Sequence, residues 1–200
     1  MRQYPIAMNN ANVSRDANRA KLYNATGKTK PRKEFCNGQT NISRSCPSGR
    51  KPIRRVAPLK EHLGPILWQL PPNMEKDLPR LDEFLAQLPR AYSYAVEFRH
   101  PSWNDEEVLS FLKERKVAFV SVSSMRMPMN LGTTANFVYV RFHGLEPGAA
   151  HDYTRAELKP WAAHCRAALR KGLSVYAYFN NDWNVRAPKN AKELIEMITS

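Results

Sequence analysis

The chain has 200 residues, and 31 Lys or Arg against 18 Asp or Glu give it a net charge of +13. This length suits one ordinary domain with a buried core. No run of about 18 apolar residues occurs, and the first residues lack the apolar segment of a secretory signal, so we expect neither a spanning helix nor secretion.

Three cysteines bear on the cellular compartment. Cys36, Cys46 and Cys165 are too few and too scattered for a disulfide framework, and their spacing does not match a zinc site. We therefore expect a reducing, cytoplasmic location. The Arg-rich, acid-poor N-terminus overlaps in composition with organelle transit peptides, but Pro5, Gly27 and Pro31 interrupt any amphipathic helix there, so a transit peptide is not favoured.

The positive charge is concentrated at the start of the chain. Residues 1–57 hold 13 Lys or Arg and two acids, which leaves 18 and 16 for residues 58–200. Residues 1–55 also show no sustained apolar period, so a disordered basic segment is expected there. A solvated tail is favoured over a nucleic-acid-binding arm, because the segment lacks the interleaved aromatic residues of a stacking platform.

After Val56 the pattern becomes regular. The run 63–70 is almost wholly apolar and is closed by two prolines, which predicts a buried strand. Apolar residues at spacings of three and four predict an amphipathic helix over 77–88. A second strand is predicted over 92–99, and Asn104 is a candidate cap for the helix that follows.

That helix is expected over 105–116, because acids at its start and bases at its end both suit the helix dipole. Two further strands are predicted over 117–123 and 137–143. A capping-box pattern at Thr154 predicts a helix that ends near Lys171.

Proline and glycine punctuate the last part of the chain. Pro160 lies inside the predicted helix, where it should cause a kink or a late restart. A fifth strand is expected over 174–180 and a final helix over 189–198. Five strands alternating with helices predict an α/β fold with parallel pairing through right-handed crossovers.

Polar side chains collect at the ends of these strands. Glu97 and Arg99 end the second strand on one side of it, and Arg141 and His143 do the same on the fourth. The fifth strand ends in Asn180. Ligands of parallel α/β folds bind at the carboxyl ends of the strands, so the sequence predicts a site there.

Two interpretations of this cluster remain open. In one, Glu97 and Arg141 form an interior ion pair and His143 donates to a carbonyl, which holds the sheet together. In the other, Arg99 and Arg141 clamp an anionic ligand, with Glu97 and His143 as general base and acid. Neither interpretation assigns a reaction.

Cofactor signals are weak. Glu97, His143 and Asp182 could suit a divalent ion, but no tight ligand spacing supports a metal site and none is assigned. The chain has neither a nucleophile elbow nor a glycine-rich phosphate motif. The cofactor is therefore left unknown, as is whether the protein is an enzyme.

Four motifs in the same order resemble the YecE-like family, which is domain of unknown function 72. They occupy residues 63–72, 95–103, 137–144 and 175–182. The resemblance implies a TIM-type β/α barrel of uncharacterised function, mostly in bacteria and archaea. It also places the family's characteristic polar positions at Glu97, Arg99, His100, Trp103, Arg141, His143, Asn180, Asn181 and Asp182.

The sequence departs from this family in three respects. The first strands of the barrel are not recognisable, Ser123 or Ser124 replaces a usual acid, and Pro160 interrupts a helix. We therefore expect a truncated protein: a partial barrel of about five strands over 56–200, preceded by an unrelated basic segment over 1–55. An incomplete barrel leaves an open edge that favours self-association.

Together these observations predict a small-molecule site at the carboxyl face of the partial barrel, for an anionic or polyhydroxylated ligand. Glu97 and His143 are the candidate catalytic pair. The candidate ligand-binding residues are Arg99, His100, Trp103, Arg141, Asn180, Asn181 and Asp182. The alternatives are a nucleic-acid binder that uses the basic segment and an inactive fragment.

Overall fold

The computed structural model describes residues 4–8, 53, 58–59 and 63–200. The described residues form one six-stranded sheet in the order β1-β6-β5-β4-β3-β2. The strands are β1 (Tyr4–Met8), β2 (Ile66–Gln69), β3 (Tyr94–Glu97), β4 (Ala118–Ser124), β5 (Phe137–Gly144) and β6 (Ser174–Phe179). The helices are α2 (Leu78–Ala86), α3 (Glu106–Glu114), α4 (Arg155–Arg170) and α5 (Arg186–Thr199), with short 3-10 turns η3 (Pro101–Trp103), η4 (Pro147–Ala149) and η5 (Trp183–Val185).

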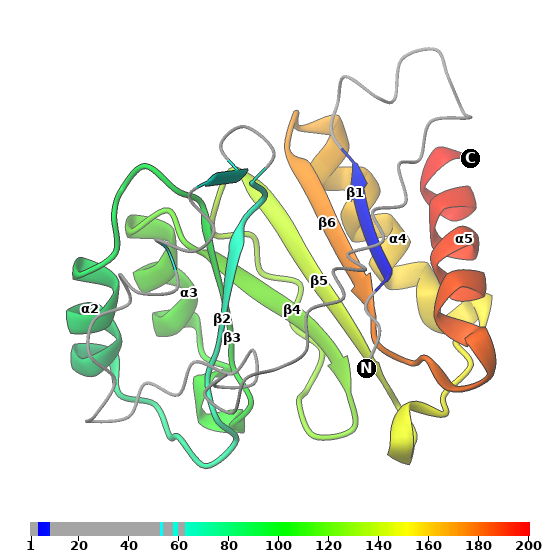
Figure 1. The fold of residues 1–200 in the computed structure, drawn as a ribbon, viewed down its shortest axis with the longest axis horizontal. Helices are drawn as coiled ribbons and strands as arrows, with labels where there is room; N and C mark the ends of the chain where they lie inside the picture. The colour runs from blue at the N-terminus through cyan, green and yellow to red at the C-terminus, as the bar shows by residue number, and fades with distance from the viewer. Residues whose placement is uncertain (1–3, 9–52, 54–57, 60–62) are drawn as a thin grey trace.

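Strands β2 to β6 run parallel and lie side by side in chain order. They form a curled half-barrel with the helices on its outside (Figure 1). This confirms the predicted α/β class and the five-stranded partial barrel. Because the strands are parallel, all five carboxyl ends meet along one rim.

The two faces of the half-barrel have different linings. On the outer face, α4 and α5 pack on β5 and β6, and α2 and α3 pack on β2 to β4, through two apolar clusters. The inner face carries a smaller cluster of mainly short and aromatic side chains that includes Ala95, Val120 and Tyr139. Alternation along β5 therefore places Arg141 and His143 on the inner face with Tyr139.

The edges of the sheet differ from each other. Strand β1 pairs antiparallel with the edge of β6 that faces away from β5. Strand β2 ends the sheet at the opposite side, and within the described part of the chain no strand pairs with its outer edge. Self-association through an open edge thus remains a prediction, and β2 is the strand that it concerns.

The basic segment was expected to contain no regular element, yet β1 lies within it. A five-residue strand that pairs with a partner about 170 residues later leaves no periodic signal of its own. The rest of the predicted disorder, together with the positive charge on which nucleic-acid binding would depend, falls almost wholly outside the described residues.

Helix starts are set by local side chains. Asp105, and not Asn104, caps α3, because its carboxylate accepts from the Glu107 amide at 2.9 Å. The side-chain Oδ1 of Asn104 instead accepts from Asn130 Nδ2 at 2.6 Å. The capping box at Thr154 is confirmed, since its hydroxyl accepts from the Glu157 amide and Glu157 accepts from the Thr154 amide.

Two predicted helix starts near prolines were wrong. Helix α4 does not restart at Pro160 but continues through it, because buried residues on either side, Leu158 and Trp161, both pack on the sheet. Helix α5 begins at Arg186 and not after Pro188, because a proline in the first turn removes an amide that has no intrahelical partner.

In the described ranges, no helix combines the length and the apolar character needed to span a bilayer.

Candidate functional site

Six polar side chains meet at the carboxyl rim of the half-barrel. We call them the strand-end network: Gln69, Glu97, Arg99, Arg141, His143 and Asn180. Gln69 and Glu97 are the last residues of β2 and β3 and lie opposite each other in register. Asn180 directly follows β6, where its amide continues the ladder by donating to the Phe142 carbonyl at 2.8 Å.

Glu97 is the centre of this network. Its side chain has no exposed surface, and Oε2 accepts from Arg141 Nη1. Oε1 is ion-paired with Arg99 Nε and lies 3.1 Å from His143 Nε2. A buried carboxylate is tolerated only when its oxygens are paired in this way. Both oxygens of Glu97 are thus already engaged.

Gln69 holds the two arginines from the neighbouring strand. Its Oε1 accepts from Arg99 Nη2 at 3.2 Å and from Arg141 Nη1 at 3.1 Å. The sequence analysis gave Gln69 no role in the site. The sequence feature that could have identified it is its position as the one polar residue at the end of an otherwise apolar strand.

His143 lies between Glu97 and Asn180. Asn180 Nδ2 is 3.0 Å from Nδ1 of the ring, and Glu97 Oε1 is on the Nε2 side. Arg99 Nη2 also lies 3.0 Å from Nε2. The carboxylate can only accept and the guanidinium can only donate, so the contact with Glu97 favours a proton on Nε2 and the contact with Arg99 favours a proton on Nδ1. Burial lowers the pKa of His143, Glu97 raises it, and the charges of Arg99 and Arg141 lower it again, with a net decrease. The ring is therefore neutral near pH 7.

The charges of the network do not cancel. Burial alone would raise the pKa of Glu97, but the hydrogen bond from His143 and the charges of Arg141 and Arg99 lower it to about 2. Glu97 therefore stays ionised and neutralises one arginine. With His143 neutral, one positive charge remains at the rim.

Exposure identifies the side chains that can meet a ligand. The Glu97 side chain is 0% exposed and that of Arg141 is 6% exposed. His143 and Arg99 reach 14% and 25%. Glu97 and Arg141 thus form the inner part of the network, and Arg99 with His143 forms its outer part.

His100 and Trp103 lie apart from the strand-end network. His100 Nδ1 is 2.8 Å from Ser102 Oγ at the start of η3. Trp103 is fully buried in the outer core, where it stacks on Phe98 at 4.5 Å and donates from Nε1 to the Met74 carbonyl at 2.8 Å. Neither residue hydrogen-bonds to the strand-end network, and their ligand-binding role stays a prediction.

Asn181 and Asp182 also lie outside the network. Asn181 alternates to the outer side of the sheet, where Nδ2 donates to the His151 carbonyl at 2.8 Å and to Asn190 Oδ1 at 2.7 Å. It thereby ties the end of β6 to α5. Asp182 precedes η5 and makes no capping bond with its side chain.

Metal binding was left unassigned by the sequence. Within the part of the chain that the structure describes, no group of three or more His, Cys, Asp or Glu side chains could hold a metal ion. Glu97, His143 and Asp182, the conceivable ligand set, therefore do not come together as such a group.

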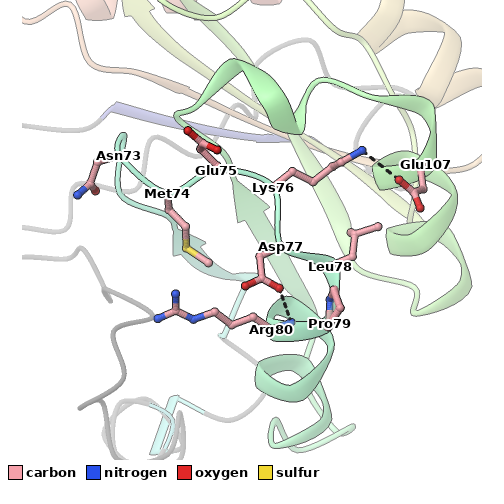
Figure 2. Close-up of a pocket in the computed structure, with 9 residues that line it drawn as sticks. All are labelled: Asn73, Met74, Glu75, Lys76, Asp77, Leu78, Pro79, Arg80 and Glu107. Carbon is pink, nitrogen blue, oxygen red and sulfur yellow. Dashed lines mark hydrogen bonds and ion pairs between the residues drawn. The ribbon is translucent and has the colours of Figure 1, made fainter.

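One hollow in the described surface lies away from the strand-end network. Its volume is about 660 Å³, and it is lined by the loop between β2 and α2 and by the first turn of that helix (Figure 2). Lys76 lines it, but its ammonium group already contacts Asp105 at 2.5 Å and Glu107 at 3.0 Å. No residue of the strand-end network lines this hollow. The hollow and the candidate site at the network are therefore separate.

Comparison with protein families identifies the chain. The model described as "Protein of unknown function DUF72" matches residues 29–200. The chain belongs to the DUF72 family. The family match begins upstream of residue 56, where the partial barrel was expected to begin, and so reaches into the basic segment that was expected to be unrelated to it.

Solved DUF72 structures share this fold. A DUF72 protein of Thermotoga maritima matches with a TM-score of 0.69 and 28% identity, over 76% of this chain and 64% of its own. Two structures of a DUF72 protein of Enterococcus faecalis match with TM-scores of 0.66 and 0.65 at 20% and 19% identity, over 74% of this chain and 66% and 64% of theirs. This chain thus spans just under two thirds of the length of these relatives. No protein with curated annotation matches it.

Proposed function

We propose that this DUF72 protein binds a small anionic ligand at the carboxyl rim of its half-barrel, with Arg99 as the main contact and His143 beside it. The observation that carries the proposal is the charge imbalance of the strand-end network. Glu97, the one carboxylate of the network, faces two guanidinium groups, and Arg99 is the more exposed of them.

The orientation of Arg99 supports binding. Its Nε is fixed by Glu97 and its Nη2 by Gln69, while Nη1 makes no hydrogen bond to any described residue. A guanidinium that other side chains already hold in place loses little conformational freedom when it pairs with an anion. Partial burial also strengthens that pairing relative to one in open water.

The two interpretations of the sequence apply to different parts of the network. The Glu97–Arg141 pair fits the structural interpretation, because it is enclosed and its hydrogen bonds are internal. Arg99 fits the ligand-binding interpretation. An anionic ligand is favoured over a neutral polyhydroxylated one, since a neutral ligand would leave the excess positive charge unpaired.

The proposal concerns binding and assigns no reaction. General acid–base chemistry would require Glu97 or His143 to release a hydrogen bond that it makes in this structure. Whether this protein is an enzyme therefore depends on a change of the network that a bound ligand would have to cause.

Thermal unfolding with a panel of small molecules tests the proposal. Phosphate, sulfate and acetate would be compared with glucose, using the wild type, Arg99→Gln and Arg170→Gln. The last variant removes an exposed arginine on α4 and matches the charge change. An anion present at about ten times its Kd stabilises the folded protein by about 1.4 kcal/mol, or roughly 3–6 °C in melting temperature for a chain of this size.

We expect an anion to raise the melting temperature of the wild type and of Arg170→Gln, with at least a tenfold loss of affinity in Arg99→Gln. Equal shifts in all three proteins, or a response to glucose alone, would overturn the proposal.

A further inference from the structure

We propose that Arg126 and Arg99 together form a two-arginine clamp for a dianionic phosphoryl group, which defines the ligand class as phosphate monoesters. This inference rests on the proposed function and adds a second contact residue to it. Arg126 lies outside the strand-end network and was not among the residues that the sequence singled out.

The topology places Arg126 at the same rim as Arg99. Strand β4 lies between β3 and β5 in the sheet, and it ends at Ser124. Arg126 follows two residues later, so it leaves the carboxyl end of the strand that separates Arg99 from His143. Loops at this end of parallel strands carry the ligand contacts of β/α barrels.

Arg126 has a charge without a partner. Its side chain is exposed, and within the described ranges it makes no hydrogen bond or ion pair. Burial lowers the pKa of Arg99, Glu97 raises it, and the charges of Arg141 and of Arg126 lower it. Arg126 is therefore close enough to Arg99 for the two guanidinium groups to repel each other.

Two arginines at the same rim, of which Arg126 makes no ion pair with a described carboxylate, suit one bound anion. Glu97 contributes one negative charge, while Arg99, Arg141 and Arg126 contribute three positive charges, so these four side chains carry a net charge of +2. A carboxylate or a phosphodiester would neutralise half of that charge. A phosphate monoester carries about −1.5 to −2 at pH 7 and has three acceptor oxygens, enough to bridge two guanidinium groups.

Two ligands of similar shape and different charge separate the clamp from general anion binding. Methyl phosphate is a dianion at pH 8, and dimethyl phosphate is a monoanion. Calorimetric titrations would use the wild type, Arg126→Gln, Arg99→Gln and Arg170→Gln. Urea denaturation would first establish that all four proteins fold, which we expect because Arg126 and Arg170 are exposed.

We expect the wild type and Arg170→Gln to prefer methyl phosphate over dimethyl phosphate by roughly tenfold or more. Arg126→Gln should lose that preference, with about a tenfold drop for methyl phosphate and little change for dimethyl phosphate. In the wild type, the affinity for methyl phosphate should also rise with pH through about 6, where the second proton leaves.

The remaining outcomes distinguish the clamp from the proposed function. If Arg126→Gln keeps the wild-type affinity and preference while Arg99→Gln loses both, the clamp is overturned and the anion site at Arg99 stands. If Arg99→Gln binds both ligands as the wild type does, or if the wild type binds neither, the clamp and the proposed function both fail.

Discussion

Glu97 and Arg141 form an enclosed ion pair that spans the inner face of the half-barrel from β3 to β5. Strand β4 lies between these two strands, so the pair crosses over it. The pair needs both partners, because either charge alone would be buried without compensation. It thereby fixes the carboxyl ends of two non-adjacent strands. Through its other oxygen, Glu97 also holds Arg99 and His143 in position.

Glu97→Gln should destabilise the protein strongly. The amide keeps the size of the side chain but leaves two guanidinium groups without a counter-charge, which costs about 3–5 kcal/mol. Urea denaturation measures the loss. Glu107→Gln is the matched control, since the Glu107 side chain is 65% exposed and its pair with Lys76 is screened by solvent and contributes little to stability. Equal losses in the two variants would contradict the central role of Glu97.

Stability should fall in acid, in part through Glu97. The pKa of Glu97 is lowered to about 2 in the folded protein, whereas an unfolded glutamate titrates near 4.3. A lowered folded-state pKa gives stability that is present above the unfolded value and is lost as the pH falls toward the folded value. The free energy of unfolding of the wild type should therefore decrease between about pH 4.3 and 2.

Other carboxylates contribute to the same acid transition, among them Asp82 and Asp105, whose pKa values are lowered by Arg115 and Lys76. The informative quantity is consequently the difference between the wild type and Glu97→Gln. That difference should shrink as the pH falls through this window. A difference that stays constant from pH 6 to 2.5 would count against a paired carboxylate at Glu97.

Trp103→Phe should reduce stability without changing anion affinity. The substitution removes the hydrogen bond from Nε1 to the Met74 carbonyl and part of the stacking on Phe98, at a cost of about 1–3 kcal/mol. Urea denaturation and phosphate titration of the same sample measure both quantities. A change in phosphate affinity with unchanged stability would instead place Trp103 against the ligand.

Gly144→Ala should destabilise the turn that follows His143. Gly144 has a φ of +91°, and an added Cβ would lie 3.1 Å from the Cβ of His151. A left-handed non-glycine residue costs about 1–3 kcal/mol. Gly64→Ala is the control, because its nearest neighbour would be the Tyr176 ring edge at 3.7 Å, an ordinary contact. Similar thermal stabilities for Gly144→Ala and the wild type would show that the turn relaxes.

Much of the fold could be predicted from the sequence because its signals are periodic. The apolar run before Pro71 and the spacing of three and four in α2 identify element types, and alternation places Glu97 with Arg99 and Arg141 with His143. The same alternation separates Asn180, which reaches the network, from its neighbour Asn181, which turns to α5.

The remaining features depend on contacts that leave no local pattern. A tryptophan just after a strand, such as Trp103, can line a pocket or fill the core, and only packing decides between them. Strand β1 is defined by its distant partner β6. Arg126 lies in an irregular loop, where no periodicity relates it to Arg99.

The central claim is that Arg99 contacts a bound anion, and a side-chain NMR titration tests it most directly. Arginine Nε–Hε resonances would be assigned by substitution and followed while phosphate is added. We predict a saturable shift of the Arg99 resonance that is much larger than that of Arg170. Saturable binding with no shift at Arg99, or equal shifts at both arginines, would contradict the account.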